Sequence, residues 1–322
     1  MYHRFDGQSN SASRLPDKKV LSRQVDLIRA HHPVITPDDH LQILTGAVES
    51  RCPVVLTVDD GYADFWEIAY PVFKEAGIPA MLFVTTGFVS GDIWFWWDRL
   101  RYLIENARPH GHRFTQGDMT FALDLNSPQG REKAWHETAD YCRFLADNDK
   151  EKFIIDLGTR LGVDVPPTPP ANMSAATWDQ IRQMAADGML FGAHTVNHPI
   201  LTRVPQDAVL AEMNGSKIRL EKELGHHIGW FCYPQGGPAD YNSAIRAQAA
   251  ELFRGAYVAF MNLDNDGDAF TLPRYGATRD LTAFRWALCG AEHLVLRLRK
   301  LVGLRTGVGD AYWAGNTPRE SV

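Results

Sequence analysis

Short apolar runs bounded by turn residues constrain the fold of this chain more than any other feature of its sequence. The clearest of these runs span residues 54–58, 80–84, 189–193 and 230–233. Each run is short and mostly apolar, which is typical of a strand that is buried on both faces of a parallel sheet. We therefore expect these four runs to form buried parallel strands.

Segments with a helical spacing of apolar residues precede or follow the predicted strands. They begin near an Asp or a Thr, end at a Gly, and span residues 64–77, 177–188 and 207–225. Such residues are typical of helix boundaries. The alternation predicts right-handed βα units, which close into a barrel or spread into an open sheet. In both architectures, functional side chains lie at the carboxyl ends of the strands.

The region between residues 93 and 172 lacks strand patterns of this kind. It resembles several helices with polar faces and ends in a cluster of prolines at residues 166–170, which favours a loop there. Because 322 residues can bury one large core, we predict a single α/β domain over residues 1–322 with a helical insertion at residues 93–172. We expect residues 303–322 to form a loose tail.

Charge and composition exclude several classes of protein. The net charge is −6 without a long basic run, so we expect no nucleic-acid partner. The four cysteines form no Cys-x-x-Cys pair, which favours a reducing compartment over a disulfide scaffold. The sequence has neither an N-terminal apolar signal stretch nor an apolar run of about 18 residues. We expect a cytoplasmic protein without a membrane-spanning segment, although a start upstream of Met1 would hide a leader.

Two adjacent carboxylates follow the first apolar run directly. The segment VVLTVDDGYADF places Asp59, Asp60 and Gly61 where a strand is expected to end, and barrel folds carry functional groups at such ends. Successive side chains of a strand point to opposite sides, so one carboxylate can face a metal ion and the other a substrate. Taken alone, an Asp-Asp-Gly sequence also fits a simple turn.

Two histidines follow another apolar run. In LFGAHTVNHPIL, His194 stands at the expected strand end and His198 lies four residues later. The two imidazoles can converge on one ion if the backbone turns between them. With one carboxylate, they leave positions on a divalent ion for water and a substrate carbonyl. A second carboxylate would accept the proton of that water, which predicts hydrolysis of an amide or ester.

Three stretches of the chain resemble NodB-type polysaccharide deacetylases, the enzymes of carbohydrate esterase family 4. They read TVDDG, MSAATWDQIRQMAADGMLFGAHTVNHPIL and FCYPQGGPADYN. The resemblance covers roughly residues 1–92 and 173–285. It implies a NodB-type domain with a deformed (β/α) barrel of seven strands. It also implies hydrolytic removal of acetyl groups from an N-acetylated sugar in a polysaccharide or glycoconjugate.

The resemblance further implies roles for four residues. Asp59 matches the catalytic base of the family, and Asp60, His194 and His198 match its metal ligands. The expected ion is Zn²⁺, and Co²⁺, Ni²⁺ or Mn²⁺ would also suit such a site. The expected partner is an N-acetylated carbohydrate substrate, whereas the sequence leaves the oligomeric state open.

The third motif departs from the family pattern. Many members read Phe-Arg-Pro-Pro-Tyr-Gly, whereas this chain reads Phe-Cys-Tyr-Pro-Gln-Gly at residues 231–236. The family uses the backbone N–H at the aromatic position to bind the oxyanion, so the N–H of Gln235 is the candidate here. The arginine that orients the base is missing from this motif. Arg274 in LPRYG resembles the arginine that some relatives supply from a later strand.

The C-terminal Leu-x-Leu-His motif, which carries the general acid in the family, is not visible. Exopolysaccharide deacetylases with a permuted motif order have a Tyr-His pair near the N-terminus, and this chain has Tyr2 and His3. His3 is therefore the candidate that protonates the leaving amine. Only two residues precede it and no strand is predicted to fix it, so we expect this end of the chain to fray.

Two other hypotheses stay open. A catalytically weak, metal-containing carbohydrate-binding relative would keep the metal ligands without a secure general acid, but it has no clear need for Asp59 beside Asp60. Substitution of Asp59 by asparagine would separate this hypothesis from an enzyme. A non-haem iron oxygenase also uses two histidines and one carboxylate, but its usual His-x-Asp order is absent from this sequence.

Overall fold

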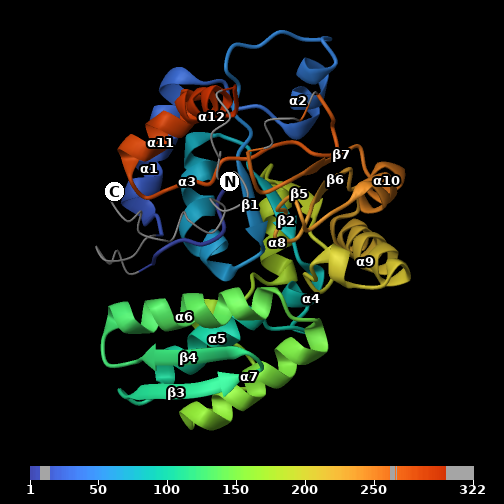
Figure 1. The fold of residues 1–322 in the computed structure, drawn as a ribbon. Helices are drawn as coiled ribbons and strands as arrows, with labels where there is room; N and C mark the ends of the chain where they lie inside the picture. Colours follow the sequence, from blue (N-terminus) through green and yellow to red (C-terminus); the bar gives the residue numbers. More distant parts are fainter. Residues whose placement is uncertain (8–14, 262–264, 266, 302–322) are drawn as a thin grey trace. The chain divides into compact units, whose positions relative to one another are not determined.

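Helices and strands alternate along much of the chain in the computed structural model (Figure 1). The structure describes residues 1–7, 15–261, 265 and 267–301. The tail that was predicted at residues 303–322 lies outside the described residues.

The chain divides into two compact units. The first combines Met1–Ser90 with Ser174–Val322, and the second spans Gly91–Met173. The second unit covers nearly the same residues as the insertion predicted at residues 93–172. The first unit is therefore folded from two segments that are far apart in the sequence.

Five parallel strands form the sheet of the first unit, in the order β1-β2-β5-β6-β7. Four of them overlap the predicted apolar runs, whereas the fifth, which has three residues, was not predicted. Their bounds are β1 Thr57–Asp60, β2 Met81–Val84, β5 Leu190–Ala193, β6 Trp230–Cys232 and β7 Gly255–Tyr257.

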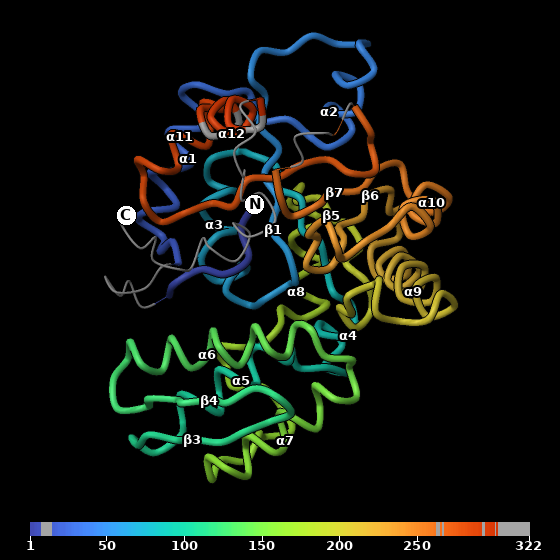
Figure 2. Tube along the Cα trace, viewed as in Figure 1, coloured from blue at the N-terminus to red at the C-terminus, as the bar shows by residue number. Residues whose placement is uncertain are grey.

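Two short segments continue this sheet and close it into a ring. Tyr2 bridges β1 in parallel, and Leu272 bridges β7 in parallel; Figure 2 shows the N-terminal segment beside β1. The backbone nitrogen of Met1 donates to the carbonyl oxygen of Tyr275 at 2.8 Å, and the N–H of Ala277 donates to the carbonyl oxygen of Met1 at 2.7 Å. The predicted deformed (β/α) barrel is confirmed as a curled sheet of five strands with two bridged segments.

The strand β2 is buried on both faces, as its continuous apolar run predicts. Leu82 and Val84 belong to the larger apolar cluster, which also contains residues of the helices. Met81 and Phe83 belong to a separate cluster with side chains of β6 and β7. The second cluster lies on the same face of the sheet as the odd-numbered residues of β1, because neighbouring parallel strands are paired residue by residue.

The helices of the first unit begin and end at recognisable caps. Thr177 and Gln180 form a capping box at the start of α8, and α9 ends at Gly225, which has a φ of 72°. The described helices are α1 Lys18–His31, α2 Pro37–Leu44, η1 Phe65–Ala69, α3 Tyr70–Ala76, α4 Thr86–Val89, α8 Trp178–Ala186, η3 Leu201–Arg203, α9 Gln206–Leu224, α10 Ser243–Leu252, α11 Leu281–Leu288 and α12 Ala291–Leu301.

Replacing Tyr2 by alanine is expected to lower the free energy of unfolding by about 3–5 kcal/mol, as for other large buried aromatic residues. Tyr2 is 4% exposed, its ring stacks on Phe5, and its hydroxyl donates to Gln24 at 3.0 Å. Tyr2→Phe keeps the ring and is expected to cost only about 1 kcal/mol. Urea denaturation measures both effects. Equal stability of Tyr2→Ala and the wild type would show that the N-terminal segment is not packed on the sheet.

The second unit contains a β-hairpin that the sequence analysis did not predict, so this segment is not helical throughout. β3 Gly111–Gln116 pairs with β4 Met119–Asp124 in antiparallel fashion. Both strands expose alternate residues and have no continuous apolar run, which is why they were missed. The helices of this unit are α5 Trp96–Asn106, α6 Pro128–Arg143, α7 Asp147–Leu161 and η2 Ala171–Met173.

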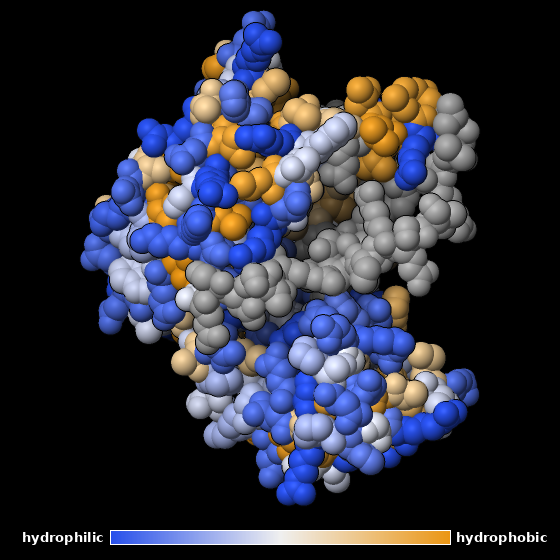
Figure 3. Space-filling model, turned by 90° about the vertical axis from the view of Figure 1, so that its left-hand side faces the viewer, coloured by the Kyte–Doolittle hydropathy of each residue, from blue (hydrophilic) through white to orange (hydrophobic). Residues whose placement is uncertain are grey.

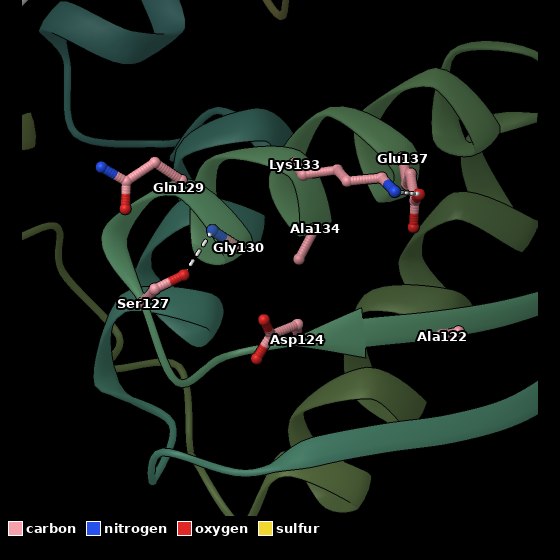
Figure 4. A pocket seen from close by; sticks show the side chains of 8 residues that line it. All are labelled: Ala122, Asp124, Ser127, Gln129, Gly130, Lys133, Ala134 and Glu137. Carbon is pink, nitrogen blue, oxygen red and sulfur yellow. Dashed lines mark hydrogen bonds and ion pairs between the residues drawn. The ribbon is translucent and has the colours of Figure 1, made fainter.

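The second unit also has a pocket of about 350 Å³ where β4 ends and α6 begins (Figure 4). Its polar groups make local contacts: the N–H of Gly130 donates to Oγ of Ser127 at 3.0 Å, and Asn126 donates to Asp124. Two groups of side chains among the described residues could hold a metal ion, and neither of them lies in this unit. The candidate chemistry is therefore in the first unit.

The surface of the protein is mainly polar on the face that Figure 3 shows, and apolar side chains gather there in small groups. None of the helices in the described part of the chain is both long enough and apolar enough to span a bilayer.

Candidate metal centre and active site

Asp59 and Asp60 lie at the carboxyl end of β1, where they are 1% and 4% exposed. Asp60 has a φ of 76° and Gly61 a φ of 97°, a backbone region that residues with a side chain rarely adopt. The N–H of Gly61 donates to the carbonyl oxygen of Asp59 at 3.0 Å and closes a tight turn. The two carboxylates consequently have different neighbours.

Asp60, His194 and His198 form one cluster of potential metal ligands, as expected from the sequence. Nε2 of each histidine lies 3.6 Å from Oδ1 of Asp60. One ligand atom from each of the three buried residues lies within 4.8 Å of the other two. Three protein ligands of this kind leave at least one position open on a tetrahedral ion.

The orientation of His194 fits metal binding. Its Nδ1 lies 2.7 Å from the carbonyl oxygen of Cys232. Because a carbonyl oxygen only accepts, Nδ1 carries the proton and Nε2 keeps a lone pair for an ion. Burial lowers the pKa of His194, and burial together with the nearby His194 lowers the pKa of His198. Both rings are therefore held in the neutral form that a metal ion requires.

The turn between the two histidines depends on residues that the sequence analysis missed. Thr195 and His198 have φ angles of 65° and 56°, and the N–H of His198 donates to Oγ1 of Thr195 at 3.0 Å. Glu212 on α9 accepts from the N–H groups of Val196 and Asn197, both at 2.8 Å. These contacts fix the turn that brings both rings to Asp60.

Arg274 forms a bidentate ion pair with Asp59, and both distances between Nη and Oδ are 2.7 Å. Its Nε donates to the carbonyl oxygen of Val258 at 2.9 Å, and Nη1 donates to Oγ1 of Thr57 at 3.2 Å. Burial raises the pKa of Asp59, but the guanidinium outweighs this effect and holds that pKa below its ordinary value. Asp59 is therefore ionised and held in one orientation.

Cys232 occupies the motif position at which many family members have arginine, and the guanidinium of Arg274 lies against it. Nη2 of Arg274 donates to Sγ of Cys232 at 2.9 Å, and Sγ lies 3.6 Å from Oδ2 of Asp59. Cys232 also forms a second group of potential metal ligands with Asp59 and His194. The sequence analysis had assigned no role in the site to this cysteine.

Gln235 lies in the loop after β6 and has a φ of 60°. The loop is tight, since a Cβ on Gly236 would lie 2.7 Å from the nitrogen of Ala259. Within the described part of the chain, the N–H of Gln235 has no hydrogen-bond acceptor, although the residue is only 8% exposed. A buried N–H of this kind at the carboxyl end of a parallel strand suits an oxyanion donor.

His3 lies beside Asp59, with 3.6 Å between its Nε2 and Oδ2 of the aspartate. The prediction that this end of the chain frays was wrong, because the backbone on both sides of Tyr2 pairs with β1. The N–H of Tyr2 donates to the carbonyl oxygen of Thr57 at 2.9 Å, and the N–H of Asp59 donates to the carbonyl oxygen of Tyr2 at 3.1 Å. The side chain of His3 is 37% exposed, so it lies between the buried carboxylate and solvent.

The model of the polysaccharide deacetylase family matches residues 48–118 and 160–253, which together make up just over half of the chain. The matched segments contain both carboxylates at the end of β1 and both histidines of the cluster. The segment between the two matches, residues 119–159, lies within the second unit.

Comparison with individual proteins also finds similarity to polysaccharide deacetylases. The chain is 33% identical over 86 residues to the Bacillus subtilis protein named "Putative polysaccharide deacetylase YxkH", a match that covers 26% of the chain and 30% of that protein. Its fold is similar to that of the Streptococcus pyogenes deacetylase PplD in complex with acetate, with a TM-score of 0.56 and 19% identity over 87% of this chain and 91% of that one. It is also similar to IcaB from Ammonifex degensii, with a TM-score of 0.55 and 17% identity over 89% of this chain and 93% of that one. The family match and the shared fold show that this chain belongs to the polysaccharide deacetylase family.

Proposed function

We propose that this protein is a metal-dependent hydrolase that removes acetyl groups from an N-acetylated sugar of a polysaccharide or glycoconjugate. The products are acetate and a sugar amine. One observation carries the proposal: a cluster of three potential metal ligands lies next to Asp59, a buried carboxylate that Arg274 keeps ionised. Family membership supports this reaction, and the PplD structure of similar fold is a complex with acetate, the expected product.

Asp60, His194 and His198 are the residues proposed to hold the ion. We propose Zn²⁺, and Co²⁺, Ni²⁺ or Mn²⁺ also suit two imidazoles and one carboxylate. When bound, such an ion lowers the pKa of a water molecule and polarises a carbonyl group. Asp59 then accepts the proton of the attacking water, while Arg274 holds the carboxylate in the orientation that this transfer needs.

The N–H of Gln235 is proposed to donate to the acetyl oxygen as negative charge develops on it. The residue's φ of 60° fixes the direction of this donor before substrate binds, so little reorganisation is needed during the reaction. Donors of this kind contribute about 10²–10³-fold to kcat in other hydrolases.

His3 is proposed to deliver a proton to the leaving nitrogen. Partial burial lowers the pKa of His3 to about 4, although Asp59 opposes this shift, so the ring is neutral before the reaction at pH 7. The proton that Asp59 takes from water can then pass to Nε2 of His3, 3.6 Å away, and from there to the amine. All atoms of the water molecule are accounted for, since its hydroxyl group is added to the acetyl carbon and its remaining proton to the nitrogen.

Replacing His3 by glutamine is expected to lower kcat about 10²-fold, because glutamine has no group that can accept and release the proton. The metal content should not change, since His3 is outside the cluster of ligands. His31→Gln, an exposed position at the end of α1, is the matched control. Rates of acetate release from the three proteins provide the measurement, and an unchanged kcat in His3→Gln would assign the general acid elsewhere.

The substrate class is tested with matched sugars that carry acetyl groups on nitrogen or on oxygen. Oligomers of N-acetylglucosamine should yield acetate and new amine in equal amounts when the protein is loaded with Zn²⁺. Acetate from the O-acetylated sugars alone would contradict the N-deacetylase and indicate an esterase.

A further inference from the structure

A second set of potential metal ligands lies beside the first and shares one member with it. Asp59, His194 and Cys232 each offer one ligand atom within 4.8 Å of the other two, and all three residues are buried. Nδ1 of His194 bonds to the carbonyl oxygen of Cys232, which leaves only Nε2 for an ion. His194 can therefore serve one of the two sets at a time.

The second set differs from the first in the softness of its ligands. It contains a thiol, and thiolate ligands favour thiophilic ions such as Cd²⁺, Zn²⁺ and Cu⁺. A carboxylate, an imidazole and a thiolate are each ligands that Zn²⁺ accepts. Without another constraint, a thiophilic ion would be expected to bind Asp59 and Cys232 together with His194, in place of Asp60 and His198.

The constraint is the guanidinium of Arg274, which lies across the second set. It donates to both carboxylate oxygens of Asp59 at 2.7 Å and to Sγ of Cys232 at 2.9 Å. Its Nε is held by the carbonyl oxygen of Val258, so the cation is fixed in position. Two of the three ligands are engaged, and a positive charge at this distance strongly repels a divalent ion in a buried site.

We propose that Arg274 keeps a competing, thiolate-containing metal site closed and thereby directs the ion to Asp60, His194 and His198. The guanidinium neutralises the buried charge of Asp59, and it occupies the position that a metal ion bound by Asp59 and Cys232 would take. If the guanidinium is removed, Asp59 is left as an uncompensated buried charge. A divalent ion bound by Asp59, His194 and Cys232 again gives a site without net charge. The thiol proton of Cys232 passes to solvent when the thiolate binds the ion.

The proposal is tested by the ligand environment of Co²⁺ in Arg274→Met, which has a side chain of similar length without charge. A thiolate ligand gives Co²⁺ an intense charge-transfer absorption in the near ultraviolet. The wild type and Arg274→Lys, which keeps a cation, should lack this band. Arg274→Met should show it, and the double variant Arg274→Met/Cys232→Ser should lose it again.

Arg274→Gln provides a second neutral variant, because its amide can keep one hydrogen bond to Asp59. Each variant is also refolded in the presence of Cd²⁺. An ion bound at the alternative site would replace the positive charge of the missing guanidinium and so help the variant to fold. The proposal is overturned if a folded neutral variant binds Co²⁺ without the thiolate band, or if the wild type shows the band. Failure of both neutral variants to fold even with Cd²⁺ would overturn it too. The readout is metal ligation, so it does not depend on acetate release.

Discussion

Replacing Asp59 by asparagine is expected to lower kcat for acetate release by about 10²–10⁴-fold, the usual contribution of a general base. Asparagine has almost the same shape but cannot accept the proton of the attacking water. The carboxylate of Asp59 is ionised in the wild type because Arg274 pairs with both of its oxygens, so the loss should appear throughout the neutral pH range. Acetate release under saturating substrate measures the effect.

Asp59→Asn should leave metal binding and sugar binding nearly unchanged. The proposed ligands Asp60, His194 and His198 are all unaltered in this variant. Asp26→Asn, an exposed position on α1, is the matched control for activity. A variant that binds the ion and the sugar but turns over like the wild type would remove Asp59 from the mechanism.

Replacing His194 by alanine is expected to reduce metal affinity by more than about 10²-fold, since even indirect partners of a ligand contribute 10–100-fold. His194 is 2% exposed and lies at the carboxyl end of β5. Activity at micromolar metal should fall to background, because neither the remaining histidine nor Asp60 can hold the ion alone. Metal content after dialysis and acetate release provide the two measurements.

The unfolding temperature distinguishes loss of the ion from loss of the fold in His194→Ala. A ligand that binds only the native state stabilises it, so Zn²⁺ should raise the unfolding temperature of the wild type and leave that of the variant almost unchanged. His226→Ala, which alters an exposed histidine after α9, should behave as the wild type. If His194→Ala retains one tightly bound ion and full activity, the cluster is not the metal centre.

The main features of the fold and of the candidate site follow from local patterns in the sequence. Each of the four predicted strands is a short apolar run, and Asp59, Asp60 and His194 stand directly where two of these runs end. Because the strands of a parallel sheet have their carboxyl ends at one edge, sequence positions more than a hundred residues apart can be brought together. His198 could be added from its spacing alone.

The features that the sequence did not reveal depend on contacts between distant residues. The resemblance to the family had suggested Arg274 as the arginine that orients Asp59, from which it is 215 residues away. No local pattern shows that its guanidinium also contacts the thiol of Cys232, which is 42 residues away. The pairing of Tyr2 with β1 is also non-local, so the N-terminal segment was expected to fray. The hairpin of the second unit escaped prediction because its strands lack continuous apolar runs.

The central claim is that one ion held by Asp60, His194 and His198 works with Asp59 to release acetate. Its most direct test is a titration of metal-free protein with Zn²⁺, in which bound ion and acetate release from N-acetylglucosamine oligomers are measured in the same samples. We predict that both rise together to a plateau near one ion per chain, and that Asp59→Asn follows the same binding curve without releasing acetate. Stoichiometric metal binding by the wild type without acetate release from any N-acetylated sugar would contradict the account and favour a carbohydrate-binding protein.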